Sequence, residues 1–257
     1  MFALFRYVLL TASRDWLLLG VLASVGACYG LGVFTGSAAL TEKLQTSVVI
    51  FAGTARMATA LGMIVFTCYH VRRSFDNREV ESFLSKPLSR FGYVFGCWTG
   101  YVALALPPVI FIGAMLLLGN ADPAGTALWC ASVFCELALL TAFATLAALI
   151  LNGAVASTLA CAVFYVMSRL LGYFVSVMQD SSHGGGKLSS GAEGWLEGAM
   201  QATSSLLPRL DLFGRTSWLI YGPKGDAAGW YFFALQAAIY ATLLLFMAQF
   251  DIKRKQF

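Results

Sequence analysis

The chain has 257 residues, of which 59% are hydrophobic and 12% are charged. Soluble domains carry about 25% charged residues, so this composition excludes an ordinary water-soluble fold. The formal net charge is +4, but the Lys and Arg residues lie in short segments between apolar runs and form no single basic patch. We therefore expect no nucleic-acid partner, and the composition predicts a membrane protein.

Six apolar stretches are long enough to cross a membrane as helices. A helix needs about 20 apolar residues to span the roughly 30 Å hydrocarbon layer of a bilayer. The predicted spans are residues 16–35, 47–69, 92–118, 127–151, 155–178 and 229–249. The sequence therefore predicts an all-α, polytopic protein with six transmembrane helices, in which residues 1–257 form a single transmembrane domain.

Residues 1–14 precede the first predicted span and alternate apolar with polar side chains. This pattern is typical of an amphipathic helix that lies on the inner leaflet, and a frayed tail is the alternative. The next apolar run, from Trp16 to Thr35, exceeds the ~7 to 15 residues of a signal-peptide core. We therefore expect an uncleaved first helix.

The third predicted span contains two features that affect helix packing. Gly92, Gly96 and Gly100 form two overlapping G-x-x-x-G units, which place small residues on one face and allow a neighbouring helix to approach closely. Pro107 and Pro108 lie near the middle of the same span. Because proline has no backbone N–H, the pair predicts a kink there.

Three ionisable residues fall inside the predicted spans: Arg56, Glu136 and Arg169. Each lies nine residues from the outer end of its span, about 13.5 Å deep at 1.5 Å per residue. An isolated charge at such depth costs at least ~2.5 kcal/mol. The shared depth predicts that Glu136 pairs with one or both arginines. An interhelical clamp and an arginine that attracts an anionic group of a substrate are both open.

The long segment between the last two spans, residues 179–228, differs from the rest of the chain. It begins with a Ser- and Gly-rich stretch, and then Trp195, Leu196, Met200, Leu206 and Leu207 recur at near-helical spacing. This spacing predicts one or two short helices at the outer membrane interface before the last span.

Residues 70–91, between the second and third spans, contain five basic and three acidic residues. Val80, Phe83 and Leu84 recur among them at helical spacing, and Pro87 follows. This pattern predicts a short amphipathic helix that docks on a partner or on the membrane surface.

Here the chain resembles the ABC-2 type export permeases of ATP-binding-cassette transporters. The resemblance rests on the run from Asn77 to Arg90, with its Lys86-Pro87-Leu88-Ser89-Arg90 ending, and on the Pro208-Arg-Leu-Asp-Leu-Phe213 stretch before the last helix. Val80 occupies a position where many relatives have glycine. The resemblance implies that the cytoplasmic segment is the coupling helix that contacts the ATPase, through Phe75, Arg78, Glu79, Val80, Glu81, Phe83, Leu84, Lys86 and Pro87.

The resemblance also implies a permease that works as a dimer with a second copy or a paralogue, bound to a cytoplasmic ATPase. We find no P-loop and no other catalytic motif in the chain. We therefore expect no catalytic residue, metal or cofactor in the chain itself, with ATP and Mg²⁺ in the partner ATPase. A secondary transporter, or a membrane scaffold whose outer loop binds an envelope partner, is the alternative.

The distribution of basic residues predicts that both termini are cytoplasmic, in the inner membrane of the cell. This orientation places ten basic residues inside: Arg6, Arg14, Arg72, Arg73, Arg78, Lys86, Arg90, Lys253, Arg254 and Lys255. Five lie outside: Lys43, Lys187, Arg209, Arg215 and Lys224.

Single-cysteine labelling should detect this orientation. In a cysteine-free background, Ser190→Cys should react with a membrane-impermeant thiol reagent in intact cells, because the loop is outside. Ser85→Cys should react only after the membrane is opened. The reverse pattern would show that the orientation is wrong.

Overall fold

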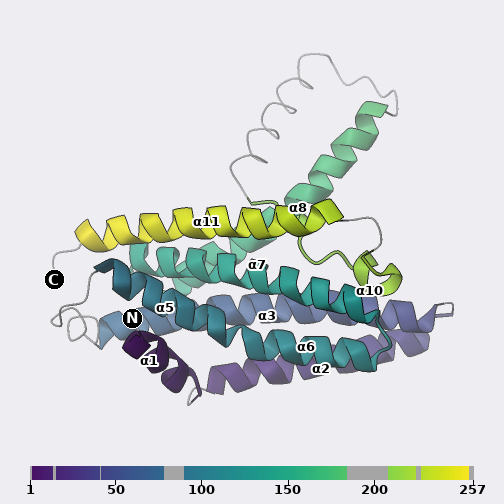
Figure 1. The fold of residues 1–257 in the computed structure, drawn as a ribbon, viewed down its shortest axis with the longest axis horizontal. Helices are drawn as coiled ribbons and strands as arrows, with labels where there is room; N and C mark the ends of the chain where they lie inside the picture. Colours follow the sequence, from purple (N-terminus) through teal and green to yellow (C-terminus); the bar gives the residue numbers. More distant parts are fainter. Residues whose placement is uncertain are drawn as a thin grey trace.

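The computed structural model describes residues 2–13, 16–40, 42–77, 90–183, 208–223 and 227–254, and these ranges contain helices and no strand (Figure 1). The helices are α1 (Phe2–Ser13), α2 (Trp16–Ala38), α3 (Lys43–Asp76), α5 (Arg90–Leu104), α6 (Leu106–Leu118), α7 (Pro123–Ile150), α8 (Ala154–His183), α10 (Ser217–Tyr221) and α11 (Ala227–Arg254), with a 3-10 turn, η1, at Leu210–Leu212. An all-helical chain satisfies its backbone N–H and C=O groups internally, as hydrocarbon requires. The predicted all-α class is confirmed.

Five helical segments in the described ranges are long and apolar enough to cross a membrane: Trp16–Ala38, Lys43–Asp76, Gly92–Leu118, Pro123–Ile150 and Tyr231–Ile252. They coincide with five of the predicted spans, and they make the chain a multi-pass membrane protein. The other predicted span, 155–178, falls in α8, whose described apolar part is Ala154–Leu170. The C-terminal turns of α8 point away from the other helices (Figure 1). The sixth crossing stays a prediction.

Both marked chain ends lie at the same end of the helix bundle (Figure 1). The end of α3 and the start of α5 lie there too, whereas the turns from α2 to α3 and from α6 to α7 lie at the opposite end, near α10. In the predicted orientation the first end is cytoplasmic and the second is outside.

Helix α7 is the centre of the bundle, because it contacts α3, α5, α6, α8, α10 and α11. Its start is well defined by sequence: Pro123 is in the first helical turn, and the Asp122 carboxylate accepts a hydrogen bond of 2.7 Å from the Gly125 N–H. Such a side-chain cap satisfies one of the N–H groups that a helix start leaves free. Most of the α7 surface is buried, including Leu137 and Leu140. Elements packed against α7 are therefore held in fixed positions.

Residues 2–13 form helix α1, so a frayed tail is wrong for these residues. Leu4, Val8 and Ala12, spaced four apart, are buried, and α1 contacts α5. The contact depends on Gly100 of α5, where an added Cβ would lie 2.8 Å from the Val8 Cβ. The three glycines of the predicted G-x-x-x-G face are buried, and at Gly100 this face packs against the N-terminal helix.

The third span is broken where the proline pair predicts a kink. Helix α5 ends at Leu104 and α6 begins at Leu106, with Pro107 in the first turn of α6. Proline is well tolerated in a first turn, where its missing N–H has no helical acceptor to lose. The prediction of a kink is confirmed as an interruption at Ala105.

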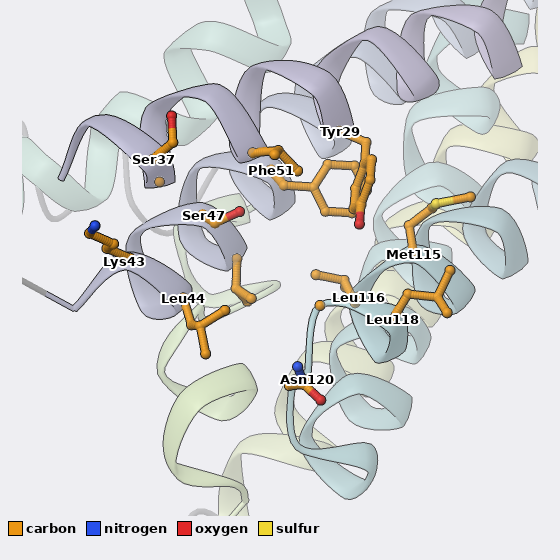
Figure 2. A pocket seen from close by; sticks show the side chains of 14 residues that line it. Tyr29, Ser37, Lys43, Leu44, Ser47, Phe51, Met115, Leu116, Leu118 and Asn120 are labelled. Carbon is orange, nitrogen blue, oxygen red and sulfur yellow. The ribbon is translucent and has the colours of Figure 1, made fainter.

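Helices α2, α3 and α6 enclose a half-open groove at the end of the bundle that the predicted orientation places outside (Figure 2). It forms because α2 and α3 are pressed together along one edge, while α6 stands further away. An added Cβ at Gly32 would lie 2.8 Å from the Phe51 Cβ, and one at Gly36 would lie 2.7 Å from the Ser47 Cβ.

Replacing Gly100 by valine should destabilise the protein, because the new side chain would overlap Val8. Overpacking of this kind costs about 1 to 3 kcal/mol, measurable as a lower midpoint of thermal unfolding in detergent. Gly30→Val is the matched control, since nothing lies within 4 Å of a Cβ at that position. Equal midpoints for the two variants would contradict the packing of α1 on α5.

Candidate functional site

Arg56 is a charged side chain in the first half of α3 (Lys43–Asp76), and only 2% of its surface is exposed. Ala52 and Ala55, which precede it on α3, are fully buried. Their small side chains allow the neighbouring helices to approach α3 closely at this level. A guanidinium has five N–H donors and is always charged. In an apolar bundle it therefore needs both a counter-charge and several hydrogen-bond acceptors.

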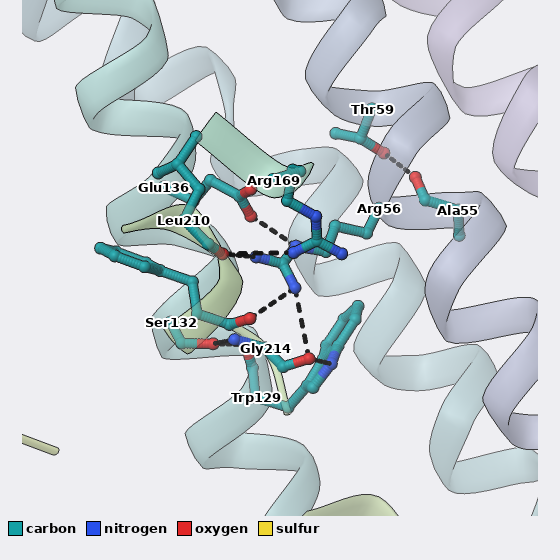
Figure 3. A network of polar contacts seen from close by, with 10 residues as sticks. Ala55, Arg56, Thr59, Trp129, Ser132, Glu136, Arg169, Leu210 and Gly214 are labelled. Carbon is teal, nitrogen blue, oxygen red and sulfur yellow. Dashed lines mark hydrogen bonds and ion pairs between the residues drawn. The ribbon is translucent and has the colours of Figure 1, made fainter. Parts of the chain in front are cut away.

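The counter-charge comes from Glu136 on α7. The Arg56 Nε donates a hydrogen bond to the Glu136 Oε2 at 2.5 Å, and the Glu136 side chain is fully buried (Figure 3). The equal depth of these two residues in their spans therefore corresponds to a direct ion pair between α3 and α7.

The acceptors come from the irregular segment Leu210–Gly214. The Arg56 Nη1 donates to the Phe213 carbonyl at 2.6 Å and to the Gly214 carbonyl at 3.2 Å, and Nη2 donates to the Leu210 carbonyl at 3.4 Å. Carbonyls inside a regular helix already accept helical hydrogen bonds, whereas a turn leaves some of its carbonyls with spare acceptor capacity. The Leu210 carbonyl also accepts from the Phe213 N–H at 3.3 Å. A break from regular helix at this point is what allows the arginine to be satisfied.

Arg169 of α8 joins the same segment rather than the carboxylate. Its Nη1 donates to the Leu210 carbonyl at 3.3 Å, so Leu210 accepts from both arginines (Figure 3). The described contacts of Glu136 are with Arg56. Of the two predicted pairings, the structure therefore shows the one with Arg56.

Gly214 is where the segment requires glycine. Its φ of +58° lies in the left-handed region, and a Cβ there would lie 2.4 Å from the Arg56 Nη1. Its N–H donates to the Ser132 Oγ at 2.9 Å, and its carbonyl accepts from the Trp129 Nε1 at 3.2 Å. Two α7 side chains thus hold the turn against the guanidinium.

The rest of the segment is anchored to the outer end of α7. The Asp122 N–H donates to the Leu219 carbonyl at 3.0 Å, and Leu210, Phe213 and Trp218 are buried. Phe213 and Trp218 also lie against Phe233 of α11, with ring centroids 5.9 Å and 6.3 Å apart. Residues 208–222 are therefore a packed part of the bundle and not a solvated loop.

The arginines and the glutamate carry an unbalanced charge: two positive side chains face one carboxylate. The Glu136 Oε1 is buried and has no hydrogen-bond partner among the described residues, and the same holds for the hydroxyls of Tyr165 and Ser168 on α8. Arg169 is more accessible than Arg56. The network combines a satisfied clamp at Arg56 with one further positive charge at Arg169, so an anionic contact at Arg169 stays open.

The predicted coupling residues are described in part. Phe75 lies half-buried in the last turn of α3. The other coupling residues lie outside the described residues: Arg78, Glu79, Val80, Glu81, Phe83, Leu84, Lys86 and Pro87. The helix predicted from Trp195 to Leu207 also lies outside them. In the outer segment, by which we mean residues 208–223 before the last helix, the structure has η1 and α10.

Sequence reasoning did not identify Trp129, Ser132 and Gly214 as partners of the buried arginine. The available signal was indirect: an arginine within a span needs more acceptors than one carboxylate supplies, and a non-helical stretch is the source of free carbonyls. The sequence indicates the stretch Pro208–Phe213 as a motif in the loop before the last helix, and not as a contact of the buried charges.

Comparison of the sequence with known protein families and with curated proteins finds no match. The resemblance to export permeases therefore rests on the motifs alone.

Replacing Glu136 by glutamine should leave the Arg56 charge unpaired and lower stability by about 3 to 5 kcal/mol. The double variant Arg56→Gln/Glu136→Gln should lose less than the sum of the two single losses, with a coupling energy of about 0.5 to 3 kcal/mol. Thermal unfolding and folded yield in detergent measure both effects.

The matched control for this cycle uses Arg169→Gln with Glu136→Gln. Its coupling energy should be smaller, because Arg169 bonds a backbone carbonyl and not the carboxylate. Equal coupling for the two arginines would mean that the pair with Arg56 is not the specific one.

Proposed function

We propose that the chain is the membrane-spanning permease subunit of an ATP-binding-cassette exporter, which moves a substrate outward with ATP hydrolysed by a partner subunit. A second permease copy or paralogue would complete the complex. The proposal rests on the motifs in residues 77–90 and 208–213, and it is supported by the way one helix connects these two regions.

That helix is α3, an uninterrupted rod of 34 residues, about 51 Å long. Its inner end leads directly into the predicted coupling segment. Twenty residues away, or about 30 Å along the axis, Arg56 holds the carbonyls of the Pro208–Phe213 region. A movement of the coupling segment would reach the outer segment through a single rigid element.

The inner end of α3 is also tied to its neighbours. Arg72 donates to the Asn152 carbonyl at 3.1 Å, in the turn between α7 and α8. The coupling segment therefore adjoins a site where α3, α7 and α8 meet, and these three helices carry Arg56, Glu136 and Arg169.

The helix that follows the coupling segment is less rigid than α3. This helix is α5, which ends at the interruption before Pro107. Helical hydrogen bonds remain from the Ala105 N–H to the Tyr101 carbonyl and from the Val109 N–H to the Ala105 carbonyl, but Pro107 and Pro108 donate none, and a helix with such missing bonds bends more easily. A push at the coupling segment would move α3 as a rod and bend the third span at Ala105, which changes the spacing between the two helices.

A secondary transporter would use the buried charges as its ion-coupling site. Arg56 instead makes one contact with Glu136 and three with backbone carbonyls, and this favours a structural clamp. A scaffold without transport activity would need no ATPase. The presence of a P-loop ATPase in a neighbouring reading frame, and its co-purification with the chain, would separate the exporter from both alternatives.

Replacing Phe83 by alanine should weaken assembly with that ATPase more than Glu81→Ala does. Apolar anchors dominate docking interfaces, whereas an exposed charge at the rim contributes only ~0 to 1 kcal/mol. Co-purification in detergent and ATP turnover of the complex measure the effect.

Phe34→Ala is the matched control, since Phe34 is 70% exposed on α2, near the end of the bundle opposite to the coupling segment. It should leave assembly at the wild-type level. Wild-type assembly and turnover in Phe83→Ala would remove the docking role and with it the main support for an exporter.

A further inference from the structure

The groove between α2, α3 and α6 has a volume of about 270 Å³ and is open on one side. Tyr29, Phe51 and Met115 lie at its inner end, and Lys43 and Asn120 lie at its outer end (Figure 2). It lies on the outside of a membrane-spanning bundle, where the surrounding medium is lipid.

The polarity of the lining changes along the groove in the same order as in a lipid leaflet. Lys43 begins α3 and Asn120 follows α6, so both belong to the outer ends of their helices. Tyr29, Phe51 and Met115 lie about one to three turns further into their helices and are apolar or aromatic. A molecule with a polar head and an apolar chain matches this order in one orientation.

The α2–α3 wall of the groove is fixed by close packing. Gly32 and Gly36 bring α2 into contact with the backbone and Cβ atoms of α3, which fixes the two helices together. Tyr29 and Phe51 meet edge to face, with ring centroids 5.3 Å apart, and form the inner wall. The end of α6 reaches this wall at Gly119, where an added Cβ would lie 3.6 Å from the Val48 Cγ2.

The size of the groove selects part of a lipid rather than a whole one. Sites for drug-sized ligands enclose about 300 to 1,000 Å³, and a volume of 270 Å³ lies below this range, so a whole phospholipid does not fit. Lys43 is the one ionised residue among the described lining residues. Glu42 precedes it, is exposed, and does not line the groove. The charge at the mouth therefore favours an anionic head.

We propose that this groove binds one acyl chain of an anionic phospholipid, with the lipid phosphate at Lys43 and the chain against Tyr29 and Phe51. The inference goes beyond the exporter proposal and does not depend on it. A positive residue at the membrane surface attracts anionic lipid, and the adjoining apolar groove gives the contact a fixed position.

Native mass spectrometry of the purified protein should detect the bound lipid. With phosphatidylglycerol and phosphatidylcholine added in equal amounts, phosphatidylglycerol should be retained preferentially. Lys43→Gln should reduce phosphatidylglycerol affinity about fivefold and remove the preference. Val33→Trp, which fills the groove from α2, should reduce the binding of both lipids.

Two control variants make the same changes in charge and in side-chain size at positions outside the groove. Arg215→Gln removes a positive charge from the same side of the protein, and Val155→Trp adds the same bulk at a 74% exposed position on α8. Both should bind lipid like the wild type. Leu118→Trp is a second filling variant, at a lining residue that is 70% exposed, if Val33→Trp lowers the unfolding midpoint.

Equal retention of the two lipids by the wild type, or an unchanged preference in Lys43→Gln, would overturn the assignment of the head group. Unchanged binding in a folded groove-filling variant would overturn the groove as the site. Displacement of the lipid by inorganic phosphate alone would show that the acyl chain contributes nothing, and would also overturn the proposal.

Discussion

The arrangement of this protein depends on one requirement: a guanidinium on α3 must be neutralised and hydrogen-bonded away from water. Glu136 supplies the charge, and the turn at 210–214 supplies the acceptors. The two sources lie on opposite sides of α8 in sequence, so meeting the requirement joins α3, α7 and the outer segment. The clamp costs desolvation of two charges, and its value lies in fixing which elements meet rather than in net stability.

Part of this network could be predicted from sequence. Charged residues inside apolar spans are costly, so their equal depths were enough to indicate a pair between Glu136 and an arginine. Depth alone did not distinguish Arg56 from Arg169, because the choice depends on which helix faces α7. The carbonyl acceptors could not be predicted, since every residue has a carbonyl and only the course of the backbone decides which ones are free.

The fold shows the same division. Apolar length identified five long helices, and the proline pair indicated the interruption at Ala105, because both signals are local. The partner of Gly100 was not predictable, since small residues permit close approach without specifying the neighbour, and the neighbour is Val8 of the N-terminal helix. The groove beside Lys43 also depends on the spacing in space of helices from three consecutive spans, which no local pattern specifies.

The contacts of Arg56 have a consequence for how the chain is made. Glu136 is 80 residues further along the sequence and Phe213 is 157 residues further. At a synthesis rate of about 5 to 20 residues per second, the glutamate emerges roughly 4 to 16 s after the arginine, and the carbonyls roughly 8 to 30 s after it. Helix α3 is therefore synthesised before any of the permanent partners of Arg56 exists. During that interval the arginine depends on water, lipid phosphates or the insertion machinery, and native packing around it is completed only when the region before the last helix has been synthesised.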